Sequence, residues 1–182
     1  SLKKVEPAEG MTVVETMPQV QFVDSDKAGW YRITLDGECK VEAADEDGAY
    51  YAKVTLDNLK RNAGGNQLPN LVIEDWPDFG YRGFMLDISR NFTTKDNILK
   101  FIDLLAHYKA SVFHLHFGDD EGWRLEIEKF PELTSFGAYH AFPSKDENGE
   151  YVETEGLIPS YNGGADPKDM TSSANGHLSK ED

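Results

Sequence analysis

Charged residues stand just past the ends of two short apolar segments of this 182-residue chain. Arg90 follows residues 84–88, and Asp119 follows residues 112–117. Both segments predict parallel β-strands, and ligands of parallel α/β folds bind at the carboxyl ends of their strands. We therefore expect Arg90 and Asp119 to lie side by side. There a guanidinium can donate to hydroxyl oxygens, and a carboxylate can orient a proton donor.

Each of these charged groups also has a simpler interpretation. Arg90 taken alone could be a surface arginine or an ion-pair partner of Asp87, and the acidic run at 119–121 could be a solvated turn. Neither residue type is specific for a site by itself. The assignment of Arg90 and Asp119 therefore depends on the sequence around them.

Two histidines raise the alternative of a metal site. His114 and His116 are two residues apart and share one face of a strand, so with Asp119 they could bind a metal. Hydrogen-bonded histidines in the interior of a barrel are the interpretation we favour. Asp166 and Asp169 could hold calcium, but their spacing is not that of an EF-hand loop. The sequence therefore predicts no metal and no cofactor.

A helix must connect the two strands. Thr93 is the expected N-cap, with Asp96 in a capping-box position, and the helix is expected to end near Lys109. Its apolar side chains fall on one stripe, at 98, 101, 102, 105 and 108. A strand, a helix and a strand joined by short links predict a right-handed parallel βαβ unit.

The upstream part of the chain predicts a small α+β unit of the ββαβ kind. A hairpin with the turn Asp36-Gly37 is followed by a helix, which Gly64 ends, and by a short strand. The four expected elements span residues 30–35, 39–43, 46–61 and 71–73. Residues 1–28 have a weak pattern that predicts only a partial strand with an arm.

The downstream part is rich in Gly, Pro, Ser and Asp from about residue 122 to 178. A segment of that length without regular structure is usually functional or mobile, and Tyr161 within it could stack on a sugar. Ser179 is expected to cap a helix that starts near the end of the chain. Two parallel strands and one helix leave sheet edges open, so we expect a fragment of a larger α/β domain.

Several motifs, in the correct order, resemble glycoside hydrolase family 20, the β-N-acetylhexosaminidases. Residues 81–92 are similar to the first barrel strand of that family, close to R-G-x-x-L-D-x-S/A-R-H/N-F/Y. Residues 114–124 are similar to the second, close to H-L-H-x-x-D-D-E/Q-G-W-R. Residues 130–138 match the segment that follows, and 29–77 contain stretches similar to the small domain before the barrel. An ordered series is more specific than one short motif.

The resemblance implies both a fold and an activity. Residues 78–182 would form the first one and a half β/α units of a (β/α)8 TIM barrel, and residues 1–77 the small α+β domain before it. The activity would be retaining exo-hydrolysis of terminal β-linked N-acetylglucosamine or N-acetylgalactosamine, with the acetamido oxygen of the sugar as nucleophile. Arg90 takes the family position that binds the 3- and 4-hydroxyls. Asp119 takes the position of the carboxylate that supports the general-acid Glu through a histidine.

The His-x-Gly-Gly-Asp-Glu segment that supplies the catalytic Asp-Glu pair of the family is not among these 182 residues. We therefore expect an N-terminal fragment, inactive alone, whose partners are the remainder of the barrel and N-acetylated amino-sugar glycans. The resemblance also implies export to the periplasm, the cell surface or the medium. The alternative is a non-catalytic carbohydrate-binding or partner-binding fragment.

Composition excludes several other classes of function. The formal net charge of -15 argues against a nucleic-acid partner, and no apolar run approaches the ~20 residues of a membrane-spanning helix. Hydrophobic residues make up 39% of the chain, which predicts a packed core. The single cysteine, Cys39, permits no intramolecular disulfide and no cysteine-based zinc site.

Overall fold

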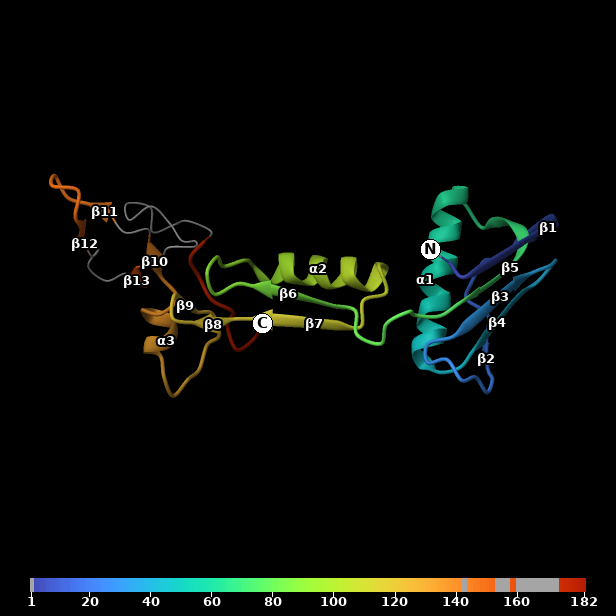
Figure 1. Cartoon of the computed structure of the whole chain (residues 1–182), viewed down its shortest axis with the longest axis horizontal. Helices are drawn as coiled ribbons and strands as arrows, with labels where there is room; N and C mark the ends of the chain where they lie inside the picture. The colour runs from blue at the N-terminus through green and yellow to red at the C-terminus, as the bar shows by residue number, and fades with distance from the viewer. Residues whose placement is uncertain (1, 142–143, 153–157, 160–173) are drawn as a thin grey trace. The chain divides into compact units, whose positions relative to one another are not determined.

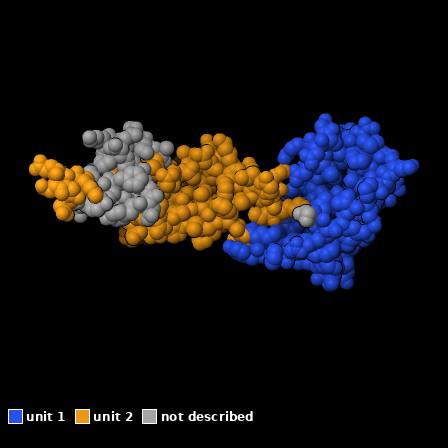
Figure 2. Space-filling model, turned by 45° about the horizontal axis from the view of Figure 1, so that its top comes forward, with its two compact units in different colours: residues 1–82 blue, residues 83–182 orange. Residues whose placement is uncertain are grey.

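The computed structural model describes residues 2–141, 144–152, 158–159 and 174–182 of the chain (Figure 1). Two compact units are present, residues 1–82 and 83–182, coloured blue and orange in Figure 2. No helix in the described part combines the length and apolarity needed to cross a membrane. The candidate site residues Arg90 and Asp119 both belong to the second unit.

The first unit is a five-stranded sheet with one long helix (Figure 1). The strand order is β1-β5-β3-β4-β2, and all neighbouring strands are antiparallel except β2 and β4. The helix packs against β3, β4 and β5. The elements are β1 Lys4–Val13, β2 Val20–Phe22, β3 Tyr31–Leu35, β4 Cys39–Ala43, α1 Glu46–Ala63 and β5 Gln67–Asp75.

Alternation along β3 builds the core of this unit. Tyr31, Ile33 and Leu35 are buried and the residues between them are half-buried, so the strand presents one apolar face to the helix. From α1, Tyr51 and Leu56 join the same cluster. Burying each such side chain contributes about 1.5–3 kcal/mol before conformational entropy is subtracted.

The helix α1 agrees with the predicted one in its start and its stop signal. Asp45 caps its N-terminus, and Gly64 ends it with a φ of 71°, a left-handed conformation that favours glycine. The side chain that enters the core is Tyr51, which is 5% exposed, whereas Tyr50 is 43% exposed. Its spacing from Val54, Leu56 and Leu59 predicts Tyr50 on the apolar stripe of this helix, and that prediction is wrong by one residue.

The N-terminal residues differ most from the prediction. In place of a partial strand with an arm, β1 is a ten-residue strand, and β2 adds a parallel pair on the far side of β4. Nearly all side chains of β1 are exposed, and its register shifts between Pro7 and Met11. Such a strand has no apolar alternation by which its sequence could be recognised. The other differences are small: β5 is longer than expected, and the loop between β3 and β4 spans residues 36–38.

We predict that the substitution Asp45→Ala destabilises the first unit by about 1–2 kcal/mol. The Asp45 carboxylate accepts the backbone N–H of Gly48 and also that of Gly29, each at 2.8 Å, so the change removes a helix cap and a loop anchor together. Urea denaturation measures the loss. Asp47→Ala is the matched control in the same helical turn, and an equal loss in both variants would contradict the role of the cap.

The second unit contains the predicted strand–helix–strand arrangement. Strand β6 (Gly83–Asp87) pairs in parallel with β7 (Val112–His116), and α2 (Lys95–His107) connects them. The register runs from Gly83 opposite Val112 to Asp87 opposite His116, so the two strands end at the same level. Parallel pairing of the two strands is thus confirmed.

The helix α2 is more exposed than its pattern predicts. Its N-cap is Thr94 rather than Thr93, and it ends at His107. Of the apolar stripe only Ile98 is buried, while Tyr108 just beyond the helix is 74% exposed. The apolar run at residues 84–88 is typical of a strand that is covered on both faces, but β6 likewise has exposed side chains in its first half. Two strands and one helix offer too little surface to bury an apolar stripe and a strand completely.

The remaining elements of this unit are short. They are β8 Gly118–Asp119, β9 Gly122–Trp123, α3 Glu132–Ser135, β10 His140–Ala141, β11 Ser144–Lys145, β12 Tyr151–Val152 and β13 Ile158–Pro159. The expected helix start at Ser179 is a turn, in which the Asp182 carboxylate accepts the backbone N–H and the hydroxyl of Ser179. Tyr161, Asp166 and Asp169 lie outside the described residues.

Candidate functional site

The two predicted site residues come from adjacent strand ends of the second unit. Arg90 lies three residues beyond β6, and Asp119 belongs to the two-residue strand β8 just after β7. A short antiparallel pairing of β8 with β9 turns the chain back on itself after β7, with Asp119 opposite Gly122. Beyond β6 the backbone N–H of Ile88 still donates to the carbonyl of His116 at 2.9 Å, which extends the contact between the strands.

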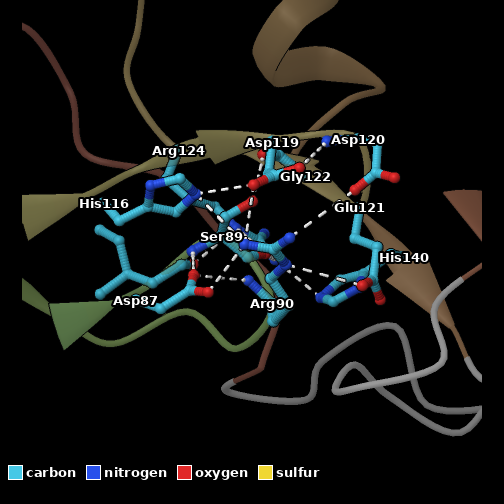
Figure 3. A network of polar contacts seen from close by, with 11 residues as sticks. Asp87, Ser89, Arg90, His116, Asp119, Asp120, Glu121, Gly122, Arg124 and His140 are labelled. Atoms are coloured by element: carbon cyan, nitrogen blue, oxygen red, sulfur yellow. Dashed lines mark hydrogen bonds and ion pairs between the residues drawn. The ribbon is translucent and has the colours of Figure 1, made fainter.

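Arg90 and Asp119 are in direct contact (Figure 3). The Nη1 atom of Arg90 lies 2.8 Å from Oδ2 of Asp119 and 2.9 Å from Oδ2 of Asp87. Asp87 also accepts the backbone N–H groups of Ser89 and Arg90, at 2.8 and 3.2 Å. The expectation that Arg90 and Asp119 lie side by side is confirmed. The simpler interpretation, an ion pair between Arg90 and Asp87, is also present.

Two further carboxylates face the same guanidinium. Oδ1 of Asp120 lies 3.9 Å from Nη2 of Arg90, and Oε1 of Glu121 lies 3.6 Å from Nε. Glu121 is only 7% exposed, whereas the Arg90 side chain is 30% exposed. We had not assigned Asp120 or Glu121 to the site, although they adjoin Asp119 in the sequence. The four carboxylates surround one cation that remains accessible to a ligand.

The Asp119 carboxylate is held in its ionised form. It accepts the backbone N–H of Asp120 and the ring Nε2–H of His116, each at 2.8 Å, and these bonds, with the nearby Arg90 charge, lower its pKa to about 2. Because Nε2 of His116 donates to Asp119, the 3.2 Å approach of Arg90 to the same nitrogen is not a hydrogen bond. His116 thus orients Asp119 rather than binding Arg90.

The metal hypothesis gains no support from this geometry. Within the described ranges, no group of three or more His, Cys, Asp or Glu side chains is arranged to hold a metal ion. His114 lies beside His116, with ring centroids 6.3 Å apart, and the described contacts of Asp119 do not include it.

The pKa of Asp119 can be measured from its carboxyl ¹³C resonance. We expect a midpoint near 2, compared with an ordinary value of 3.8. Because folding lowers the pKa of Asp119, its ionised carboxylate stabilises the folded state above pH 3.8. That contribution is lost as the pH falls toward 2. Replacing His116 with Phe should raise the midpoint, whereas His114→Phe should leave it unchanged. Equal midpoints in both variants would contradict the role of His116.

A second arginine, Arg124, belongs to the same part of the second unit. It is the last residue of the motif at residues 114–124, and its sequence context predicted no role for it. Arg124 is completely buried, and its guanidinium donates to four backbone carbonyls and one imidazole. Figure 3 shows Arg124 together with two of these partners, Ser89 and His140. Its acceptors are the carbonyls of Ile88, Ser89, Ala138 and Gly176 and Nε2 of His140. Burial lowers the pKa of Arg124 to about 10, so the group stays protonated at neutral pH.

His140 completes this buried network. It accepts Nη2–H of Arg124 at 2.7 Å, so its Nε2 carries no proton. Burial, followed by the Arg124 charge, lowers the pKa of His140. Its backbone N–H donates to the side chain of Asn175 at 3.0 Å. The network therefore joins segments that are far apart in the sequence.

Close packing joins the loop after β6 to the β8–β9 hairpin. The hydroxyl of buried Ser89 donates to the carbonyl of Gly122 at 2.7 Å. A Cβ at position 122 would lie 2.7 Å from the carbonyl oxygen of Ser89, closer than side-chain carbons approach backbone, so this contact requires glycine. The backbone that carries Arg90 is thus fixed against the hairpin that carries Asp119.

Two family models match the chain. The model described as Glycosyl hydrolase family 20, catalytic domain, matches residues 79–171, and the model described as Glycosyl hydrolase family 20, domain 2, matches residues 2–76. The first match covers more than half of the chain, and together the two account for nearly all of it.

Individual relatives and solved structures agree. The chain is 43% identical to N,N'-diacetylchitobiase of Vibrio harveyi over 67% of its own length and 14% of that protein, and 44% identical to a beta-hexosaminidase of Vibrio furnissii over 61% and 18%. A solved exo-β-N-acetylglucosaminidase of Vibrio harveyi with N-acetylglucosamine superposes with a TM-score of 0.73 at 25% identity, covering 100% of this chain and 32% of that one. The chain thus spans less than a fifth of these two curated relatives.

Proposed function

Since this chain belongs to glycosyl hydrolase family 20, we propose that it forms part of the sugar-binding rim of an exo-β-N-acetylhexosaminidase. The substrates are glycans that end in β-linked N-acetylglucosamine or N-acetylgalactosamine. The observation that carries the proposal is the 2.8 Å contact between Arg90 and Asp119 at the ends of two neighbouring parallel strands.

The proposed reaction retains the anomeric configuration through substrate assistance. The acetamido oxygen of the sugar attacks the anomeric carbon as the glycosidic bond breaks, a Glu protonates the leaving oxygen, and an Asp orients the acetamido group. Water then opens the cyclic intermediate. That Asp-Glu pair is not among these 182 residues, so the chain contributes substrate binding and support of the acid, and the downstream part of the barrel supplies the chemistry.

Arg90 is suited to hold the sugar because its Nη1 is already oriented. Asp87 and Asp119 fix that nitrogen, while the carboxylate that faces Nη2 in the described structure, Asp120, is at 3.9 Å, beyond hydrogen-bond range. Nη2 can therefore donate to adjacent hydroxyl oxygens of a terminal sugar, which match the planar fork of a guanidinium. Because the guanidinium is pre-oriented, little conformational entropy is lost when the sugar binds.

Asp119 is proposed as a supporting carboxylate. It is ionised at every physiological pH and is oriented by His116 and by the backbone of Asp120. A fixed negative charge of this kind can bind a protonated histidine from the downstream chain. Through that histidine it helps to set the pKa and the orientation of the general-acid Glu.

The domain assignment is part of the same proposal. Residues 78–182 form the first one and a half β/α units of a TIM barrel, and residues 1–77 form the small α+β domain before it. The matches of the two family models to residues 79–171 and 2–76 support this division. By the same family relation we propose that the protein acts outside the cytoplasm.

The proposal is tested with a longer polypeptide, in which the reading frame continues beyond Asp182 through the Asp-Glu segment. We expect it to hydrolyse a chromogenic β-N-acetylglucosaminide and to release a β-configured product, as followed by NMR. The 182-residue chain alone should show no turnover. A correctly folded longer polypeptide that hydrolyses neither the N-acetylglucosaminide nor the N-acetylgalactosaminide would refute the proposal. Sugar binding without turnover would instead favour the non-catalytic alternative.

A further inference from the structure

The buried Arg124 reaches the candidate site through the backbone. Its Nε and Nη2 both donate to the carbonyl oxygen of Ser89, at 3.1 and 2.8 Å, and Nε also lies 3.0 Å from the carbonyl of Ile88. The Ser89 carbonyl belongs to the peptide bond that joins Ser89 to Arg90. Arg124 therefore holds the peptide from which the Arg90 side chain projects, without touching Arg90 itself.

This burial needs a physical reason. A guanidinium loses much hydration free energy when it is buried, so buried arginines usually pair with a carboxylate. Among the described residues no Asp or Glu oxygen lies within 4.0 Å of the Arg124 guanidinium, and the acceptors are carbonyls and the neutral ring of His140. Burying an apolar side chain of similar size would cost less desolvation free energy, but that side chain could not donate hydrogen bonds to those carbonyls.

The carbonyls that Arg124 binds come from separate segments of the chain. Ile88 and Ser89 follow β6, and Ala138 precedes β10. Gly176 lies in the stretch 174–182, whose backbone is hydrogen-bonded to that of Arg124. The backbone N–H of Gly176 also donates to the carbonyl of Ala138 at 3.2 Å. A fork of five donors can satisfy this set, whereas the ammonium of lysine has three donors around one point.

We propose that Arg124 is a positioning residue, which fixes the peptide before Arg90 and so sets the guanidinium of Arg90 between Asp87 and Asp119. The inference rests on the proposed function only for the identity of the ligand that Arg90 binds, the terminal sugar. Correct placement matters because a displacement of about 1 Å at a substrate-positioning group can cost roughly 100-fold in rate. Arg124 itself contacts no substrate in this scheme.

The first test needs no activity and uses the 182-residue chain. The ¹⁵N–¹H resonance of Arg90 Nε is assigned by its absence from Arg90→Ala. In Arg124→Lys we expect this resonance to shift and its hydrogen exchange with water to accelerate by about tenfold or more. Arg32→Lys, the same change at an arginine of the first unit, should leave it unaltered.

Folding of the variant is followed by the indole N–H of Trp123, which donates to the carbonyl of Leu125. An unchanged Arg90 resonance in a folded Arg124→Lys would overturn the inference. If Arg124→Lys does not fold, His140→Ala takes its place. It removes one acceptor of Arg124 and should produce a smaller shift in the same direction, and no shift would again overturn it.

The second test uses the hydrolytic polypeptide. Arg124→Lys should raise KM and lower kcat/KM by about 10- to 100-fold, and in the Arg90→Ala background the further loss should be less than about threefold. Independent, multiplicative losses would show a general structural role and contradict the inference. If the polypeptide has no activity at all, the proposed function fails, while the Arg90 resonance still decides the role of Arg124.

Discussion

Arg90→Ala should lower the kcat/KM of the hydrolytic polypeptide by roughly two to four orders of magnitude. Hydrogen bonds from a charged donor contribute about 1.5–3 kcal/mol each, and losing two of them corresponds to this range. The substitution also leaves Asp87 and Asp119 facing each other without the cation between them. Steady-state kinetics on a chromogenic N-acetylglucosaminide measures the effect.

Two variants make the Arg90 result interpretable. Arg90→Lys keeps the charge but not the fork of donors, so it should fall between wild type and Arg90→Ala. Arg32→Ala removes an arginine of the first unit that is ion-paired with Glu74, and its kcat/KM should stay within about threefold of wild type. If the kcat/KM of Arg90→Ala equals that of Arg32→Ala, the guanidinium of Arg90 does not bind the substrate.

Arg124→Met should destabilise the second unit by at least about 3 kcal/mol. Methionine fills part of the volume but donates nothing, so the carbonyls of Ile88, Ser89 and Gly176 lose their hydrogen bonds from the guanidinium. Each buried polar group left without a partner costs about 1–3 kcal/mol. Relief of the cost of burying the guanidinium offsets part of this loss but not all of it.

Urea denaturation, followed at the Trp123 indole, measures the stability of this unit. Arg90→Met is the matched control, because it removes the same group in the same unit from a position that is 30% exposed. We expect its loss to be about 1 kcal/mol or less. Equal denaturation midpoints for the two variants would mean that the buried network does not hold the unit together.

Local sequence patterns were sufficient to predict the elements that carry the site. The apolar segments before Arg90 and Asp119 form strands, and the helix between them makes those strands parallel neighbours, which brings both side chains to one edge. The cap at Asp45 and the stop at Gly64 likewise act within a few residues of sequence. Such features depend on short-range backbone geometry, and so a sequence records them directly.

Other features depend on partners distant in sequence and were missed for that reason. The exposed strand β1 has no alternation and is held by backbone pairing with β5. The exposed half of β6 shows that an apolar run indicates a strand but not what covers it. The misplacement of Tyr50 is different, because a helical stripe read from spacing alone is uncertain by one residue at its edge.

Sequence alone determined the βαβ order, the acidic and basic residues at its strand ends and the relation to family 20, because periodicity and motif spacing are local properties of the chain. Only the tertiary structure decided that Arg124 is buried and that Ser89 and Gly176 accept its hydrogen bonds. Backbone carbonyls are the same in every residue. Folding therefore decides which carbonyls accept hydrogen bonds from a guanidinium, and residue types in the sequence do not indicate it.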